Sequence, residues 1–204
     1  MNLPVSLKSP AIVIASRPHA ETAVIARLLT EEHGLVAGYV AGGRGRRLRP
    51  VLIPGNLVSL ELRARSDSQL PFARIELVES RGPWLSEPLP AAAIAWACAL
   101  TASALPERNP YPSLYHALTA LLDAICNAPS ARGWLAAMVL YEAMLLRELG
   151  YGGSKPDAAA PLEEQFEAFR QLHKPISRYL LVDQTRDVMA ARVALGERLA
   201  RMIG

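Results

Sequence analysis

The chain changes its hydrophobic period near Pro83. Before that point, Leu57–Arg65 and Phe72–Glu79 alternate between apolar and polar residues. A period of two with one polar face is typical of half-buried antiparallel strands. Beyond Pro83 the apolar residues recur at intervals of three and four, which is typical of helices. The pattern therefore predicts an α+β chain, with a β-domain over residues 1–83 and an all-α domain over residues 84–204.

Five short strands are expected in the first domain, and turn-forming residues separate them. Their predicted ranges are 11–16, 22–29, 35–41, 57–65 and 72–79. Five strands in about 80 residues suit a small closed barrel, for which a five-stranded OB-fold is the natural candidate. An SH3-like barrel and a small sandwich are the alternatives.

The second domain is expected to hold five helices and one shorter element. The helices are predicted over 91–105, 114–125, 131–149, 163–173 and 187–202, and the shorter element over 176–182. Pro88 and Pro90 are expected in a linker before the first helix. The segment 131–149 is apolar on nearly all sides, so it should run through the middle of the domain.

A glycine- and arginine-rich segment lies between two predicted strands. It holds four guanidinium groups, those of Arg44, Arg46, Arg47 and Arg49. Guanidinium stays charged at physiological pH and pairs with phosphate through two parallel hydrogen bonds. The glycines are expected to keep the backbone mobile and to let it approach a ligand closely. The segment therefore favours binding to a nucleic-acid backbone, and the alternative is a solvated, flexible loop.

The positive charge of the chain is concentrated in the first domain. Residues 1–83 carry 11 Lys and Arg against 7 Asp and Glu, whereas residues 84–204 carry 11 against 12. Arg17 and Arg65 are further candidates for nucleic-acid binding, as are Arg63 and Arg74, although ordinary surface charge is the simpler interpretation for these four.

The aromatic residues of the first domain are few. Tyr39 lies in the middle of a predicted strand and Phe72 opens another, so both are expected in the core. Without an aromatic surface for bases, binding should depend on phosphates and discriminate weakly between single and double strands. Such binding suits strand annealing, because screening both backbones lowers the repulsion between them.

The sequence lacks the motifs of several enzyme classes. It has no phosphate-binding G-x-x-x-x-G-K-[ST] loop, no G-x-S-x-G elbow and no H-E-x-x-H motif. Cys98 and Cys126 form no C-x-x-C arrangement and have no partner at metal-ligand spacing. We therefore expect a protein that is not an enzyme and that has no metal and no cofactor.

Compartment signals favour the cytoplasm. Two cysteines do not form the framework of a secreted disulfide-rich domain, and no signal peptide is expected at the N-terminus. The longest apolar segment, Ala91–Leu105, would rise roughly 22 Å as a helix, which is shorter than a bilayer core of about 30 Å. A cytoplasmic protein with no membrane contact is therefore expected.

Segments in both domains resemble the bacterial RecO family. Ser16–Thr22, Leu29–Gly34, Gly42–Arg44 and Pro54–Gly55 resemble its N-terminal OB domain. Tyr141–Tyr151 looks like the central helix that is the hallmark of the family. The resemblance covers residues 10 to about 152 in the right order and spacing.

The resemblance implies a DNA repair and recombination mediator that is associated with the nucleoid and is not an enzyme. Such proteins bind single- and double-stranded DNA and anneal complementary strands. They assist the loading of RecA together with RecR and single-strand-binding protein. Many members carry a four-cysteine zinc module that is absent here around residues 152–161, where Gly152–Asp157 contains neither Cys nor His.

The resemblance also implies a groove in the helical domain for the acidic, Phe-ending C-terminal tail of single-strand-binding protein. That tail needs an apolar slot beside a cation, so Arg132 with Trp134, or Arg147, are candidates. The alternative is that Trp134 belongs to the core and Arg132 caps a turn. Two other functions stay open, an OB-type module for RNA or ribosomes and a non-catalytic protein-interaction adaptor.

Overall fold

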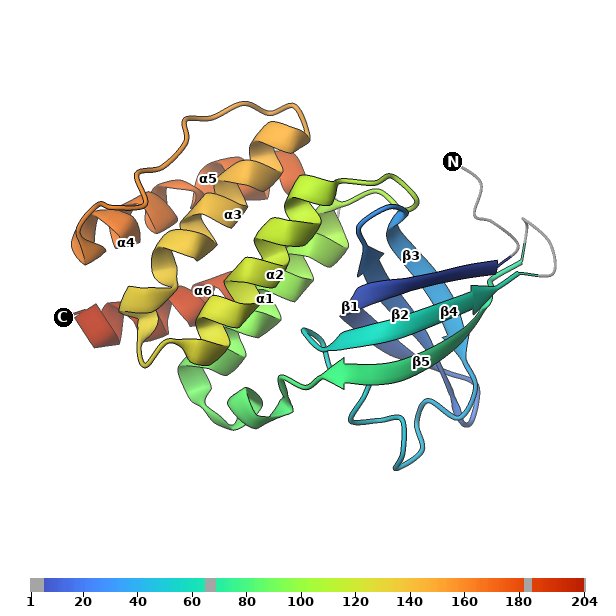
Figure 1. Ribbon diagram of the computed structural model, residues 1–204. Coiled ribbons are helices and arrows are strands. Elements are labelled where there is room, and N and C mark those ends of the chain that lie inside the picture. The colour runs from blue at the N-terminus through green and yellow to red at the C-terminus, as the bar shows by residue number, and fades with distance from the viewer. Residues whose placement is uncertain (1–5, 65–68, 182–184, 204) are drawn as a thin grey trace. The chain divides into compact units, whose positions relative to one another are not determined.

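The structure is a computed structural model that describes residues 6–64, 69–181 and 185–203 (Figure 1). The chain forms two compact units. One comprises Met1–Ser86 and Leu105–Tyr115, and the other comprises Glu87–Ala104 and His116–Gly204. The first contains the strands and the second most of the helical residues, so the expected α+β class is confirmed.

The first unit is a closed five-stranded barrel. Its strands follow the order β1-β2-β3-β5-β4, and β4 pairs with β1 to close the barrel. Neighbouring strands are antiparallel except for β3 and β5, which are parallel. This is the OB-fold that the strand count predicts. The strands are β1 (Ser6–His19), β2 (Ala23–Thr30), β3 (Gly34–Val40), β4 (Leu57–Arg63) and β5 (Phe72–Glu79).

Strand β1 is longer than the predicted 11–16 because it takes part in two pairings. Its first half pairs with β4 and its second half with β2, and the register shifts between Val13 and Ala15. Pro10 and Pro18 lie within it, and proline lacks the N–H that a strand ladder uses. The prolines therefore hide the extent of the strand from a pattern-based prediction.

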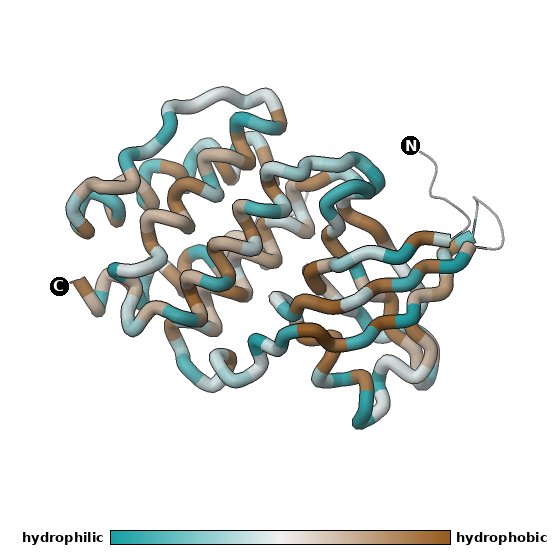
Figure 2. The backbone as a smooth tube through the Cα atoms, in the orientation of Figure 1, coloured by the Kyte–Doolittle hydropathy of each residue, from teal (hydrophilic) through white to brown (hydrophobic). Residues whose placement is uncertain are grey.

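The barrel core consists of the inward-facing residues of all five strands. Along β4 and β5, apolar and polar positions alternate, as Figure 2 shows. Val58, Leu60 and Leu62 are buried, as expected from the alternation in β4. Leu77, which shares the parity of the buried Ala73 and Ile75, is instead 43% exposed. The pairing of β5 with β4 shifts register beside it, between Leu57 and Val58.

Residues 105–115 pack on the barrel near the β2–β3 turn. The Arg108 N–H donates to the Leu35 carbonyl at 2.8 Å, and Arg27 Nε lies 3.3 Å from Glu107 Oε1. Gly34 has a φ of +66°, and a Cβ there would lie 2.0 Å from the Asn109 carbonyl oxygen. The close packing of this segment therefore requires glycine at position 34.

The helical unit agrees with the predicted helices, with shifted ends. Helix α1 begins at Pro88, so the linker expected at Pro88 and Pro90 is wrong; proline fits the first turn because its missing N–H needs no partner there. Residues 131–149 begin with a 3-10 turn, η2 (Ala131–Gly133), before α3 starts. The helices are α1 (Pro88–Ala104), α2 (Pro112–Asn127), α3 (Leu135–Glu148), α4 (Leu162–Gln171), α5 (His173–Pro175) and α6 (Thr185–Ile203). A 3-10 turn, η1 (Gly82–Ser86), precedes α1, and a π-helical turn, η3 (Ile176–Leu180), follows α5.

The buried ion pair between Glu142 and Arg192 connects α3 with α6 and also contacts α1 and α4. Glu142 on α3 accepts hydrogen bonds from Arg192 Nη2 on α6 at 2.7 Å and from Trp96 Nε1 on α1 at 2.7 Å. Burial raises the pKa of the Glu142 carboxyl, whereas Arg192 and Trp96 oppose the shift. The Arg192 guanidinium also lies 4.0 Å from the ring centroid of Phe169 on α4 and donates to the Phe169 carbonyl.

Candidate nucleic-acid interface

The four arginines lie on the segment 41–56 between β3 and β4, here called the arginine loop. The segment forms consecutive turns, in which the Arg49 N–H donates to the Gly45 carbonyl at 2.9 Å and the Leu52 N–H to the Leu48 carbonyl at 3.1 Å. Leu52 is buried in the barrel core, and Leu48 and Val51 pack against that core. The hydrogen bonds give the loop a defined conformation, and its apolar residues attach it to the barrel.

Two buried polar residues hold the C-terminal end of the arginine loop. Asn56 Nδ2 donates to the carbonyls of Pro50 and Val51 at 2.9 and 3.1 Å. Its Oδ1 accepts from the Arg81 N–H at 2.8 Å, and Arg81 Nη1 donates to the Gly55 carbonyl at 2.8 Å. Both side chains are almost fully buried. The loop therefore receives its shape from side-chain hydrogen bonds as well as from apolar packing.

Replacing Asn56 with alanine is expected to destabilise the barrel by about 2 kcal/mol, since it removes the partner of the buried Arg81 N–H and of the partly buried Pro50 and Val51 carbonyls. Urea-induced unfolding of the full chain measures the effect. Asn127→Ala is a matched control, because Asn127 is exposed and its side chain donates within its own helix, to the Asp123 carbonyl. It should change stability by less than about 0.5 kcal/mol. Unfolding of Asn56→Ala at the wild-type urea concentration would contradict the assigned role.

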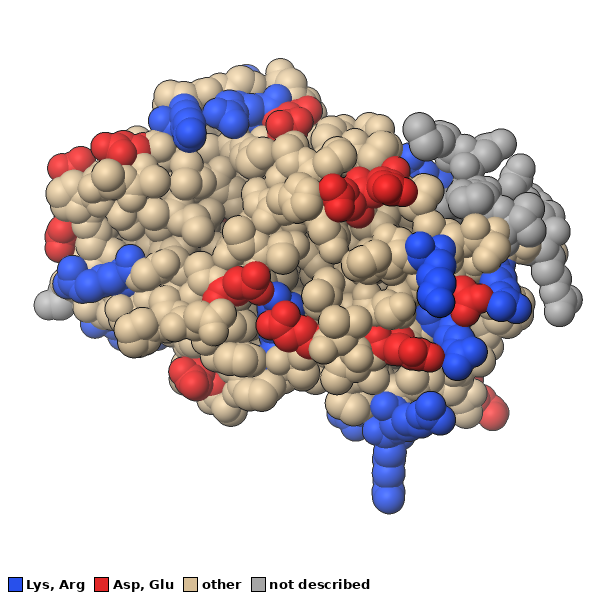
Figure 3. All heavy atoms as spheres, in the orientation of Figure 1, with Lys and Arg blue, Asp and Glu red and all other residues tan. Residues whose placement is uncertain are grey.

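All four arginines of the loop are exposed. Arg44 is also held in place, because its Nη1 donates to the Glu21 carbonyl at 2.9 Å and to the Ala20 carbonyl at 3.4 Å. Among the residues that the structure describes, no carboxylate forms an ion pair with any of the four. Figure 3 shows Lys and Arg side chains projecting from the edge of the barrel where Figure 1 places this loop. The loop therefore presents uncompensated positive charge to solvent.

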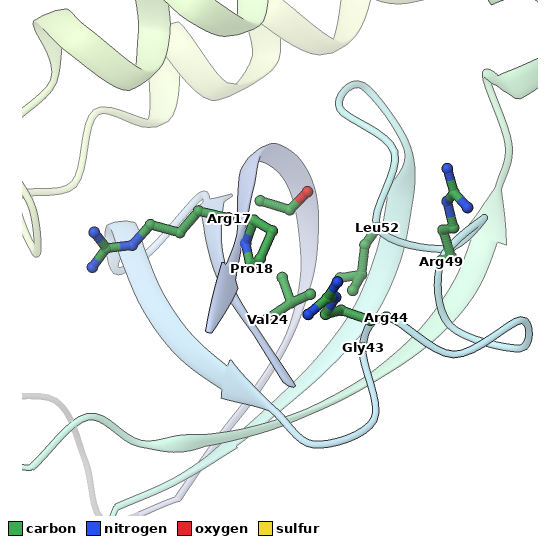
Figure 4. A pocket seen from close by; sticks show the side chains of 8 residues that line it. Arg17, Pro18, Val24, Gly43, Arg44, Arg49 and Leu52 are labelled. Atoms are coloured by element: carbon green, nitrogen blue, oxygen red, sulfur yellow. The ribbon is translucent and has the colours of Figure 1, made fainter. Parts of the chain in front are cut away.

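Arg17 joins two of these arginines around an open hollow of about 390 Å³. In Figure 4, Arg44 lies between Arg17 and Arg49, which extend on opposite sides of the hollow. Gly43 lets the loop approach β2, because a Cβ there would lie 2.8 Å from Val24 Cβ. We call this site the basic hollow; it is lined by Ser16, Arg17, Pro18, Val24, Gly43, Arg44, Arg49 and Leu52. Its charge and openness suit phosphate groups of a polyanion.

Two other candidate arginines have acidic partners. Arg63 donates to Glu61 Oε1 from Nη2 at 2.6 Å and from Nε at 2.9 Å, and this pairing lowers the pKa of the Glu61 carboxyl. Arg74 Nη2 lies 3.2 Å from Glu76 Oε1. These contacts agree with the interpretation of both as ordinary surface charge. Arg65, also a candidate, lies outside the described residues.

The expectation that Tyr39 and Phe72 belong to the core is wrong. Phe72 is 51% exposed, and Tyr39 is half-buried. Phe72 has the same parity along β5 as the exposed Arg74 and Glu76, so it points away from the core. That parity is present in the sequence and identifies Phe72 as a surface aromatic residue.

The three candidate partner-binding residues of the helical unit have different surroundings. Arg132 and Arg147 are exposed, at η2 and at the last turn of α3. Trp134 is 1% exposed and belongs to the core of the unit. Because the indole is buried, Trp134 offers no surface slot to a peptide, and only the two arginines stay accessible.

The described residues contain no helix that is long and apolar enough to cross a membrane. Within the same ranges, no three His, Cys, Asp or Glu side chains gather closely enough to hold a metal ion.

The barrel, its arginine loop and the separate helical unit define the class: an OB-fold protein with a basic surface on the barrel and an appended α-helical unit. Two family models match the chain, Recombination protein O N terminal over residues 1–81 and Recombination protein O C terminal over residues 86–154. The chain belongs to the RecO family.

Curated relatives support this assignment. DNA repair protein RecO of Rhodospirillum centenum is 46% identical over 143 residues, which cover 70% of this chain and 56% of the relative. The RecO protein of Gluconacetobacter diazotrophicus is 40% identical over 148 residues, 71% of this chain and 58% of the relative. The RecO protein of Phenylobacterium zucineum is 43% identical over 143 residues, which cover 70% of this chain and 58% of the relative. The matched part therefore spans less than three-fifths of the length of these relatives.

Proposed function

We propose that this protein is a DNA repair and recombination mediator that binds single- and double-stranded DNA and anneals complementary strands without covalent catalysis. The observation that carries the proposal is the exposed arginine loop on an OB barrel of a RecO-family chain. The names of the relatives, DNA repair protein RecO, support a role in DNA repair.

The chemistry of binding follows from phosphate neutralisation. Each phosphate that pairs with an arginine releases condensed counterions, so affinity falls as salt concentration rises. Arg17, Arg44 and Arg49 would hold phosphates at the basic hollow, while Arg46 and Arg47 extend the positive surface along the loop. Two strands bound at such a surface repel each other less, because the arginines screen both backbones. Annealing is then accelerated by lowering repulsion, with no bond made or broken in the nucleic acid backbone.

The proposed partners follow from family membership. The protein would act with RecR and with the C-terminal tail of single-strand-binding protein, and thereby assist the loading of RecA. Arg132 and Arg147 are the accessible cations proposed for the acidic tail, and Trp134 is excluded from that surface by its burial.

An annealing assay tests the proposal. The full chain is mixed with two complementary DNA oligonucleotides, one carrying a fluorophore and the other a quencher, at 50 and 500 mM salt. Annealing should be at least about tenfold faster than without protein at 50 mM salt, and this acceleration should be largely lost at 500 mM.

Three outcomes would contradict the proposal. If the protein does not accelerate annealing at low salt, the proposed annealing activity is wrong. Tighter binding of RNA than of DNA of equal length and sequence would favour an RNA or ribosome module. If the protein binds neither DNA nor RNA, the function that remains is that of a non-catalytic protein-interaction adaptor.

A further inference from the structure

Backbone pairing places five residues in one row across the outside of the barrel. Arg17 on β1 pairs with Ile25 on β2, and Ile25 pairs with Tyr39 on β3. Tyr39 pairs with Phe72 on β5, and Phe72 pairs with Arg63 on β4. All five are exposed or half-buried, whereas the residues that flank Ile25 and Tyr39 in sequence are buried. The row therefore lies on the outer surface.

Aromatic rings form the middle of this row. The ring centroids of Tyr39 and Phe72 are 5.3 Å apart at an interplanar angle of 76°. His19 lies two residues after Arg17 on β1. Its ring centroid is 5.9 Å from that of Tyr39, and the angle between the two ring planes is 87°. We call these three residues the aromatic strip. It crosses the parallel pairing of β3 with β5, where the Tyr39 N–H donates to the Pro71 carbonyl at 2.8 Å.

The two ends of the row differ in charge. At one end Arg17 lines the basic hollow with Arg44 and Arg49. At the other end Glu61 neutralises Arg63 through two hydrogen bonds. Strands lie about 4.8 Å apart, so the Cα of Arg17 is roughly 10 Å from that of Tyr39. Positive charge thus borders the aromatic strip on the side of the arginine loop, within the reach of a nucleotide and its phosphate.

An exposed aromatic surface beside cations matches the chemistry of unpaired nucleic-acid strands. Bases of a single strand can stack on aromatic side chains, and an adjacent basic surface follows the backbone. Duplex DNA keeps its bases paired and stacked on each other, so it can use only the arginines. Phe72, at 51% exposure, is the most accessible large apolar side chain in the row.

We propose that His19, Tyr39 and Phe72 form a stacking platform for the bases of single-stranded DNA, whose phosphates lie along Arg17, Arg44 and Arg49. This inference rests on the proposed function and adds a selectivity to it: the platform makes the barrel prefer single strands over duplexes. The arginine loop contributes affinity for both forms.

Binding of the 204-residue chain to labelled dT20 and to a 20-base-pair duplex tests the platform between 50 and 300 mM salt. Phe72→Ala should weaken dT20 binding about tenfold or more, because stacking on one base is lost. Duplex affinity should change less than twofold, and the salt dependence of both should stay as in the wild type. Val78→Ala is a matched control, since Val78 is an exposed apolar residue of the same strand and lies outside the row. It should leave both affinities unchanged.

A second variant keeps the test independent of folding defects. Phe72→Trp preserves an aromatic surface, so it should bind dT20 at least as tightly as the wild type. Its added indole fluorescence should be quenched by dT20 and not by the duplex, after subtraction of the wild-type signal. Equal weakening of both DNA forms by Phe72→Ala, or unchanged binding with no quenching in Phe72→Trp, would overturn the platform.

Failure of the proposed function gives a different result. In that case the wild-type protein binds neither probe, or its binding does not depend on the arginine loop. If instead the wild-type protein binds DNA through the arginine loop but shows no preference for single strands, the stacking platform is wrong and the proposed function still holds.

Discussion

Simultaneous replacement of Arg44, Arg46, Arg47 and Arg49 with alanine is expected to lower the affinity for single-stranded DNA on the order of a hundredfold at 0.1 M salt. The slope of log K against log salt should fall by about three units, because each lost phosphate contact removes roughly 0.7 unit. All four side chains are exposed, so the barrel should keep its fold. Fluorescence anisotropy across a salt series measures both quantities.

A charge-matched variant separates local contact from net charge. Arg132, Arg147, Arg170 and Arg201 are exposed residues of the helical unit, and replacing them with alanine removes the same formal charge. The slope of log K against log salt concentration for this variant should stay within about one unit of the wild-type slope. If the slope falls by the same amount in both variants, net charge and not the arginine loop determines DNA binding. Because Arg44 also bonds to the turn between β1 and β2, a triple variant that retains it should lose about two units.

Replacing Arg192 with methionine is expected to destabilise the helical unit by about 3–5 kcal/mol. The change leaves the fully buried Glu142 carboxylate without its counter-charge, while the Trp96 N–H still donates to it. It also removes the guanidinium that packs on the Phe169 ring. Urea-induced unfolding followed by circular dichroism measures the loss, and unfolding at the wild-type urea concentration would contradict it.

The double variant Glu142→Met with Arg192→Met distinguishes charge compensation from packing. Apolar side chains of similar volume need no counter-charge, so much of the lost stability should return. Arg198→Met on the same helix is the control; its guanidinium donates to the Ala194 carbonyl of its own helix, and the expected change is below about 1 kcal/mol. Arg192 lies beyond residues 86–154, so the ion pair joins α6 to the part of the unit that the family model matches.

The strands and helices were largely predictable because their signals are local. Alternation along β4 and β5 follows from the side-chain period of a strand, and Figure 2 shows the same alternation in the folded barrel. The parity of Phe72 with Arg74 and Glu76 was also sufficient to place its ring outside. The prediction of a buried Phe72 gave residue type more weight than position, and aromatic residues are buried only on average.

Local pattern alone therefore specified the OB-type strand count, the helical second half and a basic segment between two strands. Three features depended on contacts between residues distant in the chain, which periodicity does not encode. The pairing of β3 with β5 brings Tyr39 and Phe72 into ring contact. Packing of α6 against α1 and α4 brings Arg192 to Glu142 on α3. The hydrogen bonds of Asn56 and Arg81 shape the arginine loop, since buried polar groups must find partners wherever the fold supplies them.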